Sequence, residues 1–171
     1  MADDSLNNLG SIVSGEHKPQ TPPTDKMIEF GMEMLKNSSI GMELVMFAQE
    51  QNLEIKVVKG MQETSYVPDE QQVVISLKTV DPAQPSRFVL LLAGAIREVM
   101  QIKEGMRPAN INENMSKILE KTRAKQGDKI AYMCAVAYEI NELSSFTEYN
   151  LMEELRKMGY GTDVATFLDN V

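Results

Sequence analysis

The chain has 171 residues, of which 43% are hydrophobic and 25% charged, and its formal net charge at pH 7 is -8. This length and composition suit one globular domain with a buried core, and no apolar run reaches the roughly 20 residues of a transmembrane helix. The acidic balance argues against a nucleic-acid ligand, because phosphate binding needs clustered Lys and Arg. A single cysteine, Cys134, cannot form an internal disulfide, which fits a reducing compartment, so we expect a cytoplasmic protein. The lack of a long apolar run leads us to expect no membrane contact.

Residues 1–24 are predicted to be a flexible tail, since they contain several Pro and Gly and few large apolar groups. Residues 25–171 are predicted to form one domain. It begins with two amphipathic helices over 25–37 and 39–51, the second capped by Ser39. The residues expected to be buried in these helices are Met27, Phe30, Met34, Leu35, Met42, Val45, Met46 and Ala48.

The hydrophobic period then changes to two, which is typical of strands. Residues 53–57 alternate between apolar and charged, and 64–67 form a short second strand. Residues 73–77 are apolar enough to predict a largely buried third strand. The pattern therefore indicates a small sheet of two or three strands.

The next helix starts at Asp81-Pro82 or at Pro85-Ser86 and ends before Gly105. Its first half is apolar nearly all round, which predicts a central buried helix. Together with the helices that follow, this gives an α+β fold that is mostly helical, with the small sheet packed on the central helix.

Three further segments complete the predicted domain. Asn110 and Glu113 resemble a capping box for a helix that ends at about residue 125, and Gly127 predicts a break or a kink before an apolar helix over 130–140. Short helices are expected over 151–158 and 164–168.

The element order and the segment 92–101 resemble a group of uncharacterised bacterial zincin-like metallopeptidase domains. In that group a strand precedes an apolar helix that reads Leu-Ala-His-Glu-Leu-Arg-His, and a later helix carries Arg-Glu-Ala-Asp-Ala. The resemblance covers residues 38–143 and implies a zincin-like scaffold. The framework positions that match are Leu92, Ala93, Arg97, Gln101, Asp128 and Ala131.

The residues that carry the chemistry of that group are replaced here. A zinc hydrolase needs about three protein ligands and a general base. The two histidines fall on Gly94 and Glu98, the general-base glutamate on Ala95, and the glutamate of the later motif on Gln126. The only histidine, His17, lies in the predicted tail. The resemblance therefore implies a degenerate member without peptidase activity, metal or cofactor.

The leading hypothesis is a non-catalytic pseudo-peptidase domain that binds a protein partner of unknown identity. One predicted binding surface is the pair of Met-rich first helices, where Met32 lies off the buried stripe; the alternative for these methionines is core packing. The other predicted binding surface is a groove around Arg97, Glu98 and Asp128, where the resembled peptidases hold their metal. The alternative for Arg97 is an ion pair with a neighbouring carboxylate. Cys134 is not expected to be a nucleophile, because no structured histidine accompanies it.

Two other functions stay open at this point. One is an enzyme that uses carboxylates such as Glu98 and Asp128 with a hard metal ion. The other is a purely helical interaction module in which the apparent strands are loops.

Overall fold

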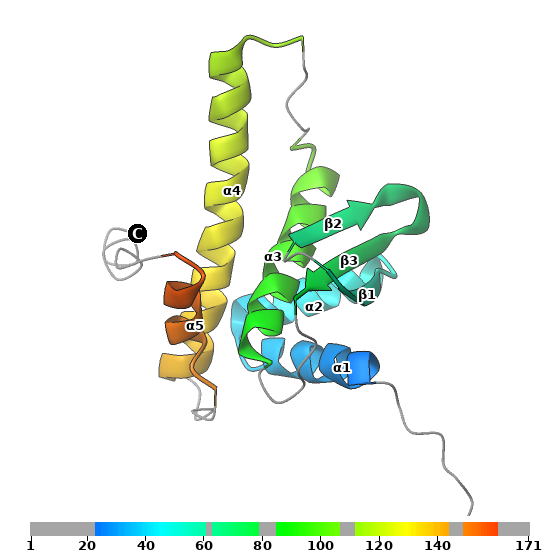
Figure 1. The fold of residues 1–171 in the computed structure, drawn as a ribbon, viewed down its shortest axis with the longest axis vertical. Helices are drawn as coiled ribbons and strands as arrows, with labels where there is room; N and C mark the ends of the chain where they lie inside the picture. Colours follow the sequence, from blue (N-terminus) through cyan, green and yellow to red (C-terminus); the bar gives the residue numbers. More distant parts are fainter. Residues whose placement is uncertain (1–22, 61–62, 79–84, 107–111, 144–148, 161–171) are drawn as a thin grey trace, which may run out of the picture.

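The computed structural model describes residues 23–60, 63–78, 85–106, 112–143 and 149–160. This part of the chain is a mostly helical α+β fold with one small sheet, as predicted (Figure 1). The elements, in chain order, are α1 (Pro23–Leu35), α2 (Ser39–Glu50), β1 (Glu54–Lys59), β2 (Glu63–Val67), the 3-10 turn η1 (Pro68–Glu70), β3 (Gln72–Leu77), α3 (Ser86–Lys103), α4 (Met115–Tyr138), the π-helical turn η2 (Glu139–Leu143) and α5 (Leu151–Lys157).

The sheet has the order β1-β3-β2, with β1 parallel and β2 antiparallel to β3. The central strand β3 is the most apolar of the three, and its residues Val73, Ile75 and Leu77 are buried. Its partners contribute fewer buried side chains, as edge strands do when one face meets solvent. The three strands predicted by the period of two are therefore paired strands and not loops.

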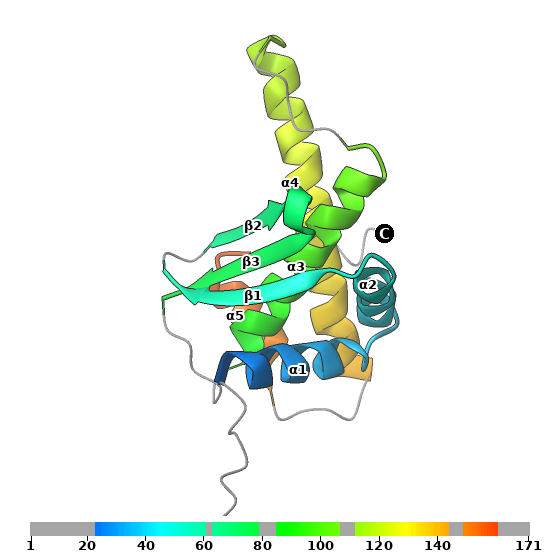
Figure 2. The same ribbon diagram turned by 90° about the vertical axis from the view of Figure 1, so that its right-hand side faces the viewer.

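Helix α3 is the centre of the domain, as its nearly continuous apolar sequence predicts. It contacts α1, α2, α4 and α5 as well as β2 and β3. Figure 1 shows the sheet on one side of α3 and α4 on the other, and Figure 2 looks onto the sheet with both helices behind it. The approach of α1 depends on Gly31, because a Cβ there would lie 2.6 Å from the Phe88 ring. Burial on all sides stabilises α3 through its apolar surface, at about 25 cal/mol per Å² removed from water.

Helix α4 differs from the prediction, because it continues through Gly127 without a break. No atom lies within 4 Å of a Cβ built at Gly127, and one exposed glycine costs a helix only about 1 kcal/mol relative to alanine. That cost is too small to interrupt a helix that packs on α3 over its second half. The N-cap is Asn114, whose side chain accepts from the Lys117 amide at 2.9 Å. The predicted cap Asn110 lies outside the described residues.

Two expectations for the first helices were wrong. Ser38, not Ser39, caps α2, and its hydroxyl accepts from the Gly41 amide at 2.7 Å. Met42 and Met46 are exposed rather than buried, because α2 buries the adjacent face that holds Leu44, Val45 and Ala48.

The predicted domain limits meet the described chain at α1, which begins at Pro23, two residues before the expected start. The predicted tail up to residue 22 and the predicted helix over 164–168 lie outside the described residues. Among the helices that are described, none combines the length and the apolar character needed to cross a membrane.

Candidate functional site

Arg97 on α3 is the centre of a charged cluster at the α3–α4 interface, and only 5% of its surface is exposed. Its Nε and Nη2 donate to the two carboxylate oxygens of Asp128 at 2.6 and 3.1 Å, and its Nη1 donates to Glu104 at 3.0 Å. The guanidinium also lies over the Tyr132 ring, 4.3 Å from its centroid. The fully buried Gln101 donates to Asp128 at 2.5 Å. Paired and stacked in this way, Arg97 fixes α4 against α3.

The charges of this cluster stabilise each other. Burial alone would raise the pKa of Asp128, but the hydrogen bonds from Arg97 and Gln101 outweigh burial and hold that pKa below its ordinary value. Burial would likewise lower the pKa of Arg97, and its hydrogen bonds to Asp128 and Glu104 raise it instead. Asp128 and Arg97 are therefore both ionised at neutral pH, which suits a structural pair better than a proton-transfer group.

A second group of charges lies beside the first on the same two helices. Glu98 on α3 accepts from Lys125 at 3.2 Å and from Lys129 at 3.5 Å, both on α4. One turn earlier, Gly94 allows α4 to approach closely, since a Cβ there would lie 2.8 Å from Sδ of Met133. Helix α4 therefore covers the face of α3 that holds Gly94 and Glu98.

The structure brings Gly94, Arg97, Glu98 and Asp128 together at this interface. It does not bring Gln126 there, because that side chain is exposed on α4. The carboxylates of Glu98 and Asp128 already accept from Lys or Arg. Within the described ranges, no three His, Cys, Asp or Glu side chains are grouped so as to hold a metal ion.

The remaining predicted residues lie in the core or against it. Ala95 is buried in α3, and Met32 is half-buried on α1 and packs against the core. Cys134 is buried in α4, and burial raises the pKa of its thiol, which keeps it in the less nucleophilic protonated form.

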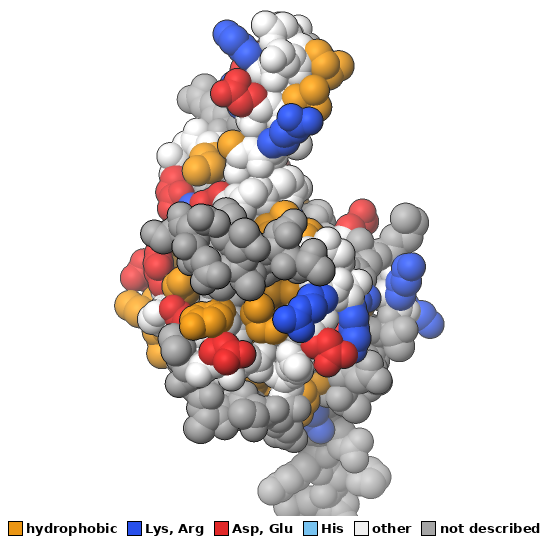
Figure 3. All heavy atoms as spheres, turned by 90° about the vertical axis from the view of Figure 1, so that its left-hand side faces the viewer, with side chains coloured by type: hydrophobic (Ala, Val, Ile, Leu, Met, Phe, Trp, Pro, Cys, Tyr) orange, Lys and Arg blue, Asp and Glu red, His pale blue; other side chains and the backbone are white. Residues whose placement is uncertain are grey.

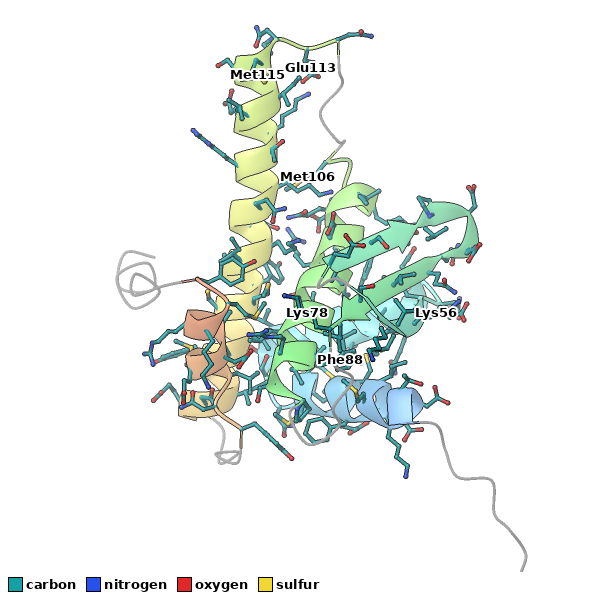
Figure 4. The ribbon with its side chains drawn as sticks, in the orientation of Figure 1. Lys56, Lys78, Phe88, Met106, Glu113 and Met115 are labelled. Atoms are coloured by element: carbon teal, nitrogen blue, oxygen red, sulfur yellow. The ribbon has the colours of Figure 1, made fainter. Side chains whose placement is uncertain are left out.

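The first half of α4 is the second candidate, and sequence reasoning did not single it out as a site. Residues 115–124, which we call the α4 arm, extend beyond the end of α3 and beyond the sheet (Figures 1 and 2). Ile118 is the only residue of the arm that is not exposed, and it is half-buried. Figure 3 shows apolar, basic and acidic side chains on this projecting part. Figure 4 places Met115 at its tip and Met106, also exposed, at the end of α3 below.

Residues Met115, Leu119 and Thr122 of the α4 arm lie on the helix face that is buried further along α4. They are spaced by four and three residues, and the same alternation leads through the exposed Gln126 and the half-buried Lys129 to Met133 and Val136. Such spacing keeps residues on one face of a helix. Met133 and Val136 are buried in the domain, whereas Leu119 is 46% and Met115 69% exposed. The spacing can be read from the sequence. Because a break was predicted at Gly127, the residues before and after it were not assigned to one helix.

Comparison of the chain with protein-family models, with curated proteins and with solved structures gave no match.

Proposed function

We propose that the protein is a non-catalytic domain that binds a partner protein through the α4 arm. The observation that carries this proposal is the row of Met115, Leu119 and Thr122, which loses its covering where α3 ends. A helix of about ten residues is marginally stable in water when nothing packs on it. A partner that covered this row would bury apolar surface and stabilise the arm together, which is how helices are recognised in grooves and bundles.

The resemblance to zincin-like peptidases is part of this proposal, with the scaffold retained and the chemistry lost. It is supported by the closeness of α4 at Gly94, where Met133 occupies the space that a ligand side chain would need. It is also supported by Glu98 and Asp128, whose carboxylates stabilise the helix pair through Lys and Arg. This use of both carboxylates disfavours the alternative of an enzyme with a hard metal ion.

We place the protein in the cytoplasm, without nucleic acid or membrane as ligand. The single buried Cys134 suits a reducing compartment, and the net charge of -8 opposes association with phosphate-rich surfaces.

The proposed function is tested by site-specific photo-crosslinking in the cells that express the full chain. A photoreactive amino acid replaces Leu119 on the arm in one variant, Lys56 on β1 in a second and Met46 on α2 in a third; all three side chains are exposed. We expect a discrete protein adduct from position 119 alone. Adducts from position 46 instead would assign binding to the Met-rich helices, and no adduct from position 119 would refute binding through the arm.

A further inference from the structure

The α4 arm and the residue after it are basic, although the chain as a whole is acidic. Between Met115 and Lys125 there are four basic residues, Lys117, Lys121, Arg123 and Lys125, against the single acid Glu120. Lys125 pairs with Glu98, and Lys121 pairs with Glu113. Lys117 and Arg123 form no ion pair with any described residue. The α4 arm therefore presents the positive charges of Lys117 and Arg123 to solvent near Met115 and Leu119.

The apolar row is also narrow. Met115, Leu119 and Thr122 lie at alternating spacings of four and three, with half-buried Ile118 next to the row. This is the pattern of a two-per-heptad seam that fits one neighbouring helix. A membrane surface requires a wider apolar face, and Lys121 and Arg123 stand one residue to either side of Thr122.

Arg123 and Lys125 flank the seam as e and g positions when Leu119 is an a position. Lys125 already pairs with Glu98 on α3, so Arg123 is the flanking charge left for a partner. In coiled coils these positions choose the partner, because like charges repel across the interface and opposite charges pair. Two copies of this arm packed antiparallel, with this heptad at the centre, would place Arg123 near Arg123 of the other copy. The flanking charge thus disfavours an antiparallel second copy and favours a partner that carries Glu or Asp opposite Arg123.

From these observations we infer that the occupant of the α4 arm is an acidic amphipathic helix of another protein, packed along Met115, Leu119 and Thr122. The inference rests on the proposed function and specifies the chemistry of its partner. The partner helix supplies Leu- or Ile-type side chains to the seam and a carboxylate to Arg123.

The test uses two synthetic helical peptides of about four heptads, with Leu at a and d and either Glu or Lys at e and g. Binding to the full chain is measured by fluorescence anisotropy at low and at physiological salt. We expect the Glu peptide to bind at least about tenfold more tightly than the Lys peptide, and increasing salt to reduce this preference. Equal binding of the two peptides, or a preference for the Lys peptide, would overturn the inference.

Variants locate the binding. Leu119→Asp on the seam should weaken the Glu peptide by about tenfold or more, and Arg123→Glu should reverse the preference between the peptides. Met46→Asp on α2 is the matched control, since Met46 is exposed to a similar degree, and it should leave binding unchanged. Circular dichroism should show the same helix content in the variants and the parent chain, because the substituted side chains are exposed.

The other occupants give different results. A dimer by analytical ultracentrifugation that Leu119→Asp dissociates would assign the seam to a second copy. Binding of anionic vesicles or duplex DNA more tightly than the Glu peptide, and dependent on Arg123, would assign it to a phosphate-rich surface. Either result would overturn the inference. A crosslink from position 119 together with equal binding of the two peptides would support the proposed function. It would refute only the inference that the partner helix is acidic.

Discussion

Asp128→Ala should be among the most destabilising changes of a charged residue in this protein. Asp128 accepts two hydrogen bonds from Arg97 and one from Gln101, and the Arg97 side chain is 7% exposed. Removal of the carboxylate leaves a buried guanidinium with Glu104 as its remaining anion. Loss of one partner of a buried pair costs about 3–5 kcal/mol; the Asp128 side chain is 29% exposed, so we expect about 3 kcal/mol.

The assay is urea unfolding followed by circular dichroism, in a double-mutant cycle with Arg97→Met. The double variant should be more stable than the sum of the single effects predicts, by about 2 kcal/mol, because the uncharged methionine side chain needs no anion. Asp128→Asn should cost less than Asp128→Ala, since the amide oxygen still accepts one hydrogen bond. A loss below about 0.5 kcal/mol for Asp128→Ala, or additive single effects, would refute the role assigned to this pair.

The same pair predicts a pH dependence with a definite sign. The pKa of Asp128 is lower in the folded protein than in the unfolded chain, so its stabilising contribution is fully present above the unfolded pKa of about 3.9. It is lost as the pH falls through the lower folded pKa. The stability difference between the parent chain and Asp128→Asn should therefore be constant from pH 5 to 7 and should shrink below about pH 4. A difference that grew in acid would contradict this assignment.

Three further predictions concern packing and the arm. Gly94→Val should destabilise the domain by about 2–4 kcal/mol in urea unfolding, because its Cβ and methyl groups meet Met133; an effect near zero would show that α4 does not pack there. Gly31→Ala should cost about 1–3 kcal/mol through contact with the Phe88 ring, and Phe88→Leu in the same chain should recover part of it. Leu119→Asp should change the unfolding free energy of the isolated protein by less than about 0.5 kcal/mol, since the side chain is half exposed; a larger loss would mean that the row is already covered.

The sequence was sufficient for the architecture because each element carries a strong local signal. The apolar residues of α3 surround the helix, so they require burial on all sides, and the structure places them in the centre. The period of two identifies β1 and the short apolar run identifies β3, and the pairing of these strands buries Val57, Val73 and Ile75. These hydrophobic patterns are formed by residues close together in the chain, so they can be read without knowledge of the tertiary contacts.

The candidate site depends on contacts that local patterns do not contain. Arg97 and Asp128 are 31 residues apart in the chain and meet only because α3 and α4 pack together. The face of α2 that turns to the core is likewise chosen by tertiary packing, and this left Met42 and Met46 exposed against expectation. The break predicted at Gly127 rests on the low helix propensity of glycine, a preference of about 1 kcal/mol that packing of the second half of α4 overrides.

The claim that the α4 arm is an uncovered binding surface is tested most directly by hydrogen–deuterium exchange along α4. In the isolated protein, amides of residues 118–124 should exchange many times faster than those of residues 133–137, because among the described residues of the arm only Ile118 is even half-buried. In the complex with the partner recovered by crosslinking, the arm amides should become protected while those of 133–137 stay unchanged. Equal protection of the two segments in the isolated protein, or an arm that stays unprotected in the complex, would contradict the account.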